Sequence, residues 1–131
     1  MRPEPPPAPK LAASIRAYFT DATRRLRDTT LAAYRGAVAE LLEWCEAEGL
    51  ATVDDLDGTA LRRFREAARV RPRLIQVAGL KRGMRVPDPD GISREPRTTN
   101  RVLRSLGTVL EELRACGVLP LTRDEIRDNV R

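Results

Sequence analysis

The sequence predicts an all-α protein: one compact bundle of four to five helices, with a long basic loop between the third and the fourth. Two observations carry this prediction. Apolar residues recur at spacings of three and four over most of the chain, which is typical of helices buried on one face. No run of alternating apolar and polar residues indicates a strand, and 131 residues suffice for one domain with its own core.

The chain begins with a proline-rich segment, residues 1–10, ahead of the predicted helical domain, residues 11–131. Each proline lacks an amide hydrogen and restrains the residue before it, so we expect a flexible leader. Apolar residues then recur at three- and four-residue steps from Leu11 onward. This spacing predicts a first helix from Leu11 to about Arg25.

The second helix is predicted from Asp28 or Thr29, whose side chains can cap its first turn, to about Glu48. Its apolar residues step regularly by three and four, which indicates one buried face. The polar stretch over residues 54–59 supplies a turn and a cap for a third, shorter helix that ends near Val70.

Prolines and glycines divide residues 71–95, so we expect an insertion loop there, with a short helix between Leu74 and Met84 as an alternative. The loop lies in the most basic part of the chain. From Arg69 to Arg104 there are ten basic and three acidic residues, a net charge of +7 in a chain whose total is +5. Such a concentration of positive charge favours a polyanionic partner.

The fourth helix is predicted to start at Pro96, since proline suits the first turn of a helix, and to end before Gly117. Its leucines again step by three and four. Thr122 and Glu125 have the spacing of a capping box and predict a short terminal helix over residues 124–129.

Few residues in the chain could carry catalysis or bind a metal. There is no histidine, which removes the commonest general base and metal ligand. Cys45 and Cys116 lie in helical patterns without metal-binding spacing, so we expect both to be small buried residues. Asp54 and Asp55 lie at a turn, where capping explains them. We therefore expect no catalytic residue, no enzyme activity, no metal and no cofactor in this chain.

The sequence also predicts a cytoplasmic location without membrane contact. No apolar run approaches the roughly 20 residues that span a bilayer, and the N-terminus lacks the apolar core of a signal peptide.

Positive charge and short polar side chains gather at the starts of the second and fourth helices, where unpaired amides favour phosphate oxygens. A helix whose polar face combines arginine, threonine and asparagine has the composition of a major-groove reader, so we expect double-stranded DNA as the partner. Two simpler interpretations remain: these residues only cap helices, and a GC-rich genome favours arginine. The candidate DNA contacts are Arg27, Thr29 and Thr30 on the second helix, Arg97, Thr98, Thr99, Asn100, Arg101 and Arg104 on the fourth, and, as a second set in the loop, Arg71, Arg73, Lys81, Arg82 and Arg85.

The order of these motifs resembles a known family. Residues 29–45 follow the pattern T-T-L-x-x-Y-R-x-x-V-x-x-L-L-x-W-C, and residues 98–113 follow T-x-N-R-x-L-x-x-L-x-x-V-L-x-x-L, with G-V-L-P soon after. In this order and spacing, from about Leu11 to Pro120, the chain resembles the N-terminal core-binding (SAM-like) domain of the tyrosine recombinases, the phage integrase family.

The resemblance implies a bacterial or phage-encoded protein that acts at the nucleoid in DNA integration and recombination. Its helical bundle would form one jaw of a clamp around the duplex. The resemblance adds Ala33 to the DNA contacts and implies contacts between neighbouring protomers through residues 15–25. It also implies a separate C-terminal catalytic domain, because no residue here matches the family's arginine, lysine, histidine and tyrosine set.

Two other functions remain open from the sequence. The first is a helical protein-interaction module whose arginine face meets an acidic partner. The second is a stand-alone helix-turn-helix regulator, which is disfavoured because a long connection, instead of a sharp turn, follows the third helix.

Overall fold

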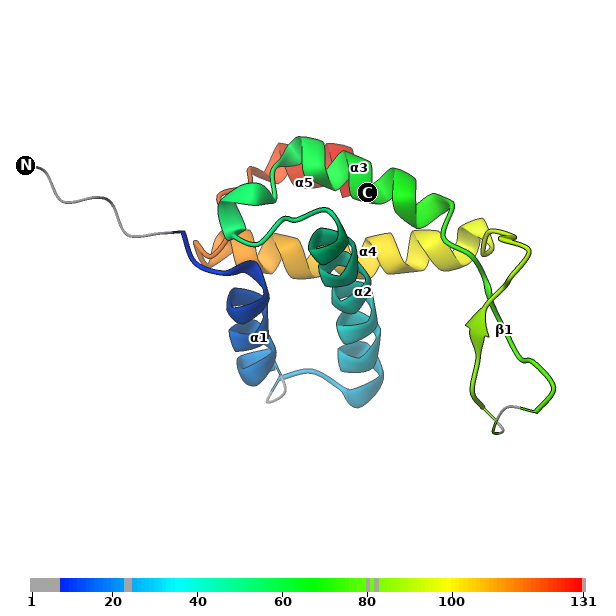
Figure 1. Cartoon of the computed structure of the whole chain (residues 1–131). Helices are drawn as coiled ribbons and strands as arrows, with labels where there is room; N and C mark the ends of the chain where they lie inside the picture. Colours follow the sequence, from blue (N-terminus) through cyan, green and yellow to red (C-terminus); the bar gives the residue numbers. More distant parts are fainter. Residues whose placement is uncertain (1–7, 23–24, 80, 82, 131) are drawn as a thin grey trace, which may run out of the picture.

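The computed structural model describes residues 8–22, 25–79, 81 and 83–130. Within these residues the chain is mostly helical, with five α-helices and one small antiparallel hairpin (Figure 1). The elements are α1 (Leu11–Ala22), α2 (Asp28–Ala47), the 3₁₀ turn η1 (Val53–Asp55), α3 (Gly58–Arg69), β1 (Leu74–Ile75), β2 (Val86–Pro87), α4 (Pro96–Ala115) and α5 (Arg123–Val130). The prediction of a helical chain with up to five helices is confirmed, whereas the expectation of no strand is wrong.

Helix α4 is the centre of the fold. It runs between two pairs of helices, α1 and α2 on one side and α3 and α5 on the other (Figure 1). Its apolar stripe, which includes Leu103, Leu106 and Leu110, is buried against residues such as Leu41 of α2 and Leu61 of α3. The spacing of the leucines in the sequence thus correctly predicted which face of this helix is buried.

The helix ends follow local sequence signals in most places. Asp57 accepts a hydrogen bond from the Ala60 amide and caps α3. At α5 the Thr122 hydroxyl accepts from the Glu125 amide, and the Glu125 carboxylate accepts from the Thr122 amide, which confirms the capping box. Helix α4 ends before Gly117, whose φ of 75° lies in the left-handed region that glycine tolerates best.

The first helix is shorter than predicted. It ends at Ala22, and the amides of Arg25 and Leu26 donate back to the Ala22 carbonyl. Residues 1–7 of the predicted leader lie outside the described residues. Residues 9 and 10 are held in place, because the Val53 amide donates to the Pro9 carbonyl. No helix in the described ranges is both long and apolar enough to cross a lipid bilayer.

The connection between α3 and α4 is a hairpin where the sequence predicted a loop. Strands β1 and β2 pair antiparallel, with Leu74 opposite Pro87 and Ile75 opposite Val86. The alternative of a short helix over residues 74–84 is therefore also wrong. β-branched side chains at Ile75 and Val86 favour extended backbone. Each strand is only two residues long, too short to show alternation in the sequence.

Candidate nucleic-acid interface

The polar start of α4 is not capped by its own side chains. The helix begins at Pro96, preceded by Glu95, whose side chain makes no hydrogen bond to the first turn. The amides of Thr98 and Thr99 instead donate to the Glu95 carbonyl. Helix α2 likewise starts without a side-chain cap, so the predicted capping role of Asp28 or Thr29 is wrong. The short polar residues at both starts therefore do not cap these helices.

Arg94, just before α4, fixes the start of this helix against two others. Its guanidinium donates to both carboxylate oxygens of Glu40 on α2, at 2.6 and 2.9 Å, and to the Ala68 carbonyl at the end of α3, at 3.2 Å. The side chain of Arg94 is only 9% exposed. Such a bidentate, largely buried pair imposes a definite geometry on the segment that leads into α4.

Thr99 belongs to this cluster and not to the surface. It is 2% exposed, its hydroxyl donates to the Ala68 carbonyl at 3.4 Å, and it accepts from Arg94 Nε at 3.0 Å. The prediction of Thr99 as a DNA contact is therefore wrong. Thr99 precedes Leu103 by four residues and so lies on the same buried face of the helix.

The other predicted residues of α4 are exposed. Arg97, Arg101 and Arg104 follow one another at steps of four and three, so they share the face of α4 that points away from the core. Thr98 and Asn100 flank them and are also exposed. The structure thus brings five of the six predicted residues of α4 to one accessible surface, which we call the α4 outer face. This face consists of Arg97, Thr98, Asn100, Arg101 and Arg104.

The arginines of this face have no partner among the described residues. Most other described arginines, such as Arg63 with Glu48 and Arg127 with Asp124, form ion pairs or hydrogen bonds. The second half of α4 differs from the first, because Glu111 there pairs with both Arg114 and Arg123. The described arginines whose side chains form no ion pair or hydrogen bond with another described residue are Arg16, Arg27, Arg85, Arg97, Arg101 and Arg104.

A hollow beside the α4 outer face extends the basic surface onto α3. It has a volume of about 570 Å³ and lies between α3, α4 and the end of α5. Arg65 and Arg69 of α3 line it together with Asn100 and Arg104. Arg65 donates to the Asp128 carbonyl at 3.1 Å, whereas Arg69 is about half exposed and pairs with Glu66. This contribution of α3 was not predicted, although the four-residue spacing of Arg65 and Arg69 places both on one helix face.

The predicted residues of α2 lie apart from those of α4. Arg27, Thr29 and Ala33 are exposed and Thr30 is half-buried. Glu40, which contacts the segment before α4, follows the start of α2 by twelve residues, a distance of about 18 Å along a helix. Figure 1 shows the start of α2 at the end of this helix that points away from α4. The structure therefore does not join the two predicted sets into one patch.

The predicted loop contacts divide into two kinds. Arg71 pairs with Glu43 at 3.4 Å, and Arg73 pairs with the buried Asp88 at 2.8 Å. The hydrogen bonds from Arg73 and from the Asp90 amide hold the pKa of Asp88 below its usual value. Arg71 and Arg73 thus anchor the hairpin.

Lys81 and Arg85 are exposed, and neither has a partner within the described ranges, so they remain candidates for DNA contact. The fifth predicted residue, Arg82, lies outside the described residues.

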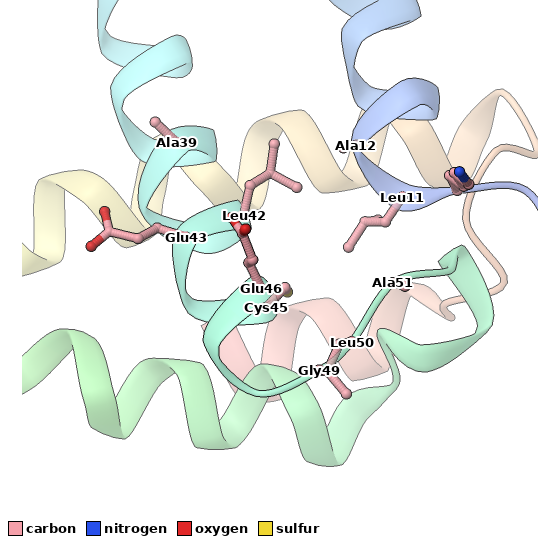
Figure 2. A pocket seen from close by; sticks show the side chains of 11 residues that line it. Leu11, Ala12, Ala39, Leu42, Glu43, Cys45, Glu46, Gly49, Leu50 and Ala51 are labelled. Carbon is pink, nitrogen blue, oxygen red and sulfur yellow. The ribbon is translucent and has the colours of Figure 1, made fainter.

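Another hollow, of about 580 Å³, lies between the start of α1 and the last turns of α2 (Figure 2). Its wall is mostly apolar, with Leu11 and Leu42 on either side. Burial raises the pKa of Cys45 to about 11, so its sulfur is a neutral thiol at physiological pH and a poor nucleophile. Cys116 is exposed, which contradicts the expectation that both cysteines are buried.

Within the described ranges, no group of three or more cysteine or acidic side chains is arranged to hold a metal ion. Comparisons with protein-family models, with curated proteins and with solved structures found no match to this chain.

Proposed function

We propose that this chain binds double-stranded DNA through the α4 outer face, as the core-binding domain of a tyrosine recombinase. The observation that carries the proposal is the row of arginines at positions 97, 101 and 104, exposed and without a partner among the described residues. Arginine forks suit phosphate oxygens and the acceptor edge of guanine.

The row is electrostatically unfavourable in the free protein. Like charges four and three residues apart destabilise a helix by about 0.2 to 0.5 kcal/mol per pair. Positive charges near a helix N-terminus also oppose the helix dipole, and Arg97 and Arg101 lie in the first two turns of α4. An anionic partner would remove both penalties.

The surroundings of the row fit a helix that approaches a groove. Thr98 and Asn100 lie exposed beside it and can donate to and accept from base edges or phosphates. Arg69 lines the same hollow as Arg104 and would contact a neighbouring phosphate. Arg27 and Thr29 would reach a different part of the DNA backbone, because the start of α2 lies about 18 Å along that helix from Glu40, the residue that contacts the segment before α4.

Salt dependence of binding to a fluorescent duplex tests the proposal. We expect the affinity to fall steeply between 50 and 200 mM salt, since phosphate contacts dominate such binding. The double variant Arg101→Ala/Arg104→Ala should bind about tenfold or more weakly and lower the slope of log K against log salt by about two.

The matched control is Arg123→Ala/Arg127→Ala, which removes the same charge from paired positions on α5. Equal weakening by both double variants would mean that only net charge matters, and no detectable binding at low salt would refute DNA binding.

The recombinase role is tested separately from binding. In this family the proposed domain positions a catalytic domain, so the chain alone should form no covalent adduct with a nicked recombination substrate. Hydroxyl-radical footprinting of the complex should show protection on one face of the duplex, as expected for one jaw of a clamp. A covalent protein–DNA adduct, or protection around the full circumference, would exclude this role.

The connection between α3 and α4 favours a core-binding domain over a helix-turn-helix regulator. A helix-turn-helix joins its two helices by three or four residues, whereas here a whole hairpin separates Arg69 from Pro96. An acidic protein is the remaining alternative for the α4 outer face. In the binding assay it would appear as competition by an acidic peptide at concentrations where duplex DNA fails to compete.

A further inference from the structure

The large apolar side chains that are strongly exposed gather in one segment. In the described ranges all of them lie between the end of α3 and the start of α4, and the helical bundle contributes none. Clustered exposed apolar side chains mark interaction surfaces in soluble proteins. These residues, with their exposed fractions, are Val70 (66%), Leu74 (55%), Val77 (41%), Met84 (51%) and Ile92 (48%).

The base of the hairpin is held firmly, so these side chains stay presented to solvent. The Arg73 amide donates to the Ile92 carbonyl and the Asp88 amide to the Arg73 carbonyl, both at 2.8 Å. The side chain of Arg73 also forms an ion pair with the buried Asp88, which joins the two arms of the hairpin at the same position. Closer to the helices, the Arg94 amide donates to the Arg71 carbonyl at 3.0 Å and connects the hairpin to the segment before α4.

Two of the exposed apolar residues lie on the two arms of the hairpin, just beyond its paired strands. The pairing ends with Ile75 and Val86, and Val77 and Met84 each lie two residues from this pair, toward the turn. The inner pair, Ile75 and Val86, is half-buried, whereas Val77 and Met84 are exposed.

The free charge next to this apolar pair is positive. Arg85 follows Met84 directly, is exposed, and has no partner among the described residues. The carboxylate of Asp88 is buried and already paired, so it does not neutralise Arg85. An aliphatic pair beside an unpaired arginine is the combination that proteins insert into the minor groove of DNA.

We propose that the hairpin enters the minor groove next to the major groove taken by α4, inserts Val77 and Met84 between base steps, and bends the duplex. This inference rests on the DNA binding proposed above. Figure 1 shows the hairpin projecting beside the start of α4. From Pro72, which bridges to Ser93 at the base of the hairpin, to Val77 an extended chain spans about 17 Å, enough to cross one phosphate backbone into the adjoining groove. Arg85 would then lie in the same groove, where the negative potential favours it.

The test measures DNA bending and groove occupancy together. A duplex with a dye at each end reports bending by energy transfer, and a minor-groove ligand such as netropsin reports occupancy by competition. The 131-residue chain should bend the duplex and compete with netropsin. The variant Val77→Ser/Met84→Ser should lose the bend and the competition and bind about tenfold more weakly, since the wedge no longer supports the deformed duplex.

The control variant is Val70→Ser/Ile92→Ser, which removes two strongly exposed apolar side chains at the base of the hairpin. It should keep the bend, and circular dichroism should show that both variants retain the helices. An unchanged bend in Val77→Ser/Met84→Ser would overturn the inference while DNA binding through α4 stands, provided that Arg101→Ala/Arg104→Ala still weakens binding.

Sedimentation at equilibrium separates the other occupant of this surface. If the wild-type chain self-associates, and Val77→Ser/Met84→Ser abolishes the association without altering the DNA bend, the hairpin contacts a second copy and the inference is wrong. Absence of DNA binding by the wild-type chain would instead remove the proposed function and this inference with it.

Discussion

Arg94 and Glu40 form a bidentate ion pair, at 2.6 and 2.9 Å, between the segment before α4 and the middle of α2. The pair lies where α2, α3 and α4 meet, since Arg94 also reaches the carbonyl of Ala68. Both side chains are largely removed from water, with exposed fractions of 9% and 16%. The direction in which α4 presents its outer face depends on this contact.

Replacing one member of this pair should destabilise the protein strongly. Glu40→Ala leaves a buried guanidinium without its anion, and we expect a loss of about 3 kcal/mol in the free energy of unfolding. Urea denaturation followed by circular dichroism measures it. The control Glu66→Ala removes the partner of Arg69 in an exposed pair and should change stability by less than about 0.5 kcal/mol. Similar losses in both variants would mean that the Arg94 pair has no special role.

Thr98 and Thr99 are neighbours that should respond in opposite ways. Thr99→Val removes a buried hydroxyl that bonds Arg94 and Ala68, and should cost about 1 to 3 kcal/mol of stability. Thr98→Val changes an exposed residue and should leave stability within about 0.5 kcal/mol while weakening DNA binding. Thermal unfolding and fluorescence anisotropy of both variants check this. A stable Thr99→Val protein would contradict the cluster around Arg94.

The two faces of α4 should separate stability from binding. Leu106 is fully buried, so Leu106→Ala should cost about 2 to 5 kcal/mol. Arg101→Ala/Arg104→Ala should instead leave the free energy of unfolding within about 0.5 kcal/mol, or raise it slightly at low salt, because it removes like charges. Urea titrations at two salt concentrations measure both effects. A large loss in the arginine variant would show that these residues support the fold.

The hairpin anchor should be sensitive to acid. The pKa of Asp88 is lowered in the folded protein by donation from Arg73 and from the Asp90 amide. A lowered folded pKa means that the contribution is fully present above the unfolded value, 3.8, and is lost as the pH falls through the folded value. Carbon NMR of the Asp88 carboxyl group should therefore show a midpoint below 3.8. In Arg73→Ala the midpoint should rise, and an unchanged midpoint would exclude the ion pair.

The two cysteines should differ in reactivity. Cys116 is exposed at the end of α4 and should react with a thiol reagent in the native protein within minutes at neutral to slightly alkaline pH. Cys45 is buried with a pKa of about 11 and should react only when the chain unfolds. Counting modified thiols in native and denaturing buffer distinguishes the sites. Native labelling of both would mean that the end of α2 opens readily.

Helical periodicity was sufficient to predict the bundle. The apolar steps of α2 and α4, the proline at the start of α4 and the capping box of α5 each correspond to an element of the structure. The hairpin could not be found in this way, because strands of two residues carry no pattern and the pairing joins Ile75 to Val86 across a long loop. Pairing of this kind is decided by tertiary contacts.

The candidate site was predictable in part. The burial of Thr99 could have been read from the sequence, since the stripe of Leu103 and Leu106 continues back to it at a four-residue step. The state of the loop arginines could not. Arg73 is paired and Arg85 is not, and the difference depends on where the fold places a single carboxylate, that of Asp88.

Helix α5 makes contacts with α3 that are separated by about half the length of the chain. Glu125 accepts from the Gly58 amide, Asn129 accepts from Arg62, and the Asp128 carbonyl accepts from Arg65. During synthesis the apolar face of α3 that packs on α5 therefore stays exposed until α5 has left the ribosome. Such distant contacts slow folding, because the entropy of closing the long loop is lost before the stabilising contacts form. Completion of this core, and with it the hollow beside α4 that Val130 helps to line, thus depends on α5.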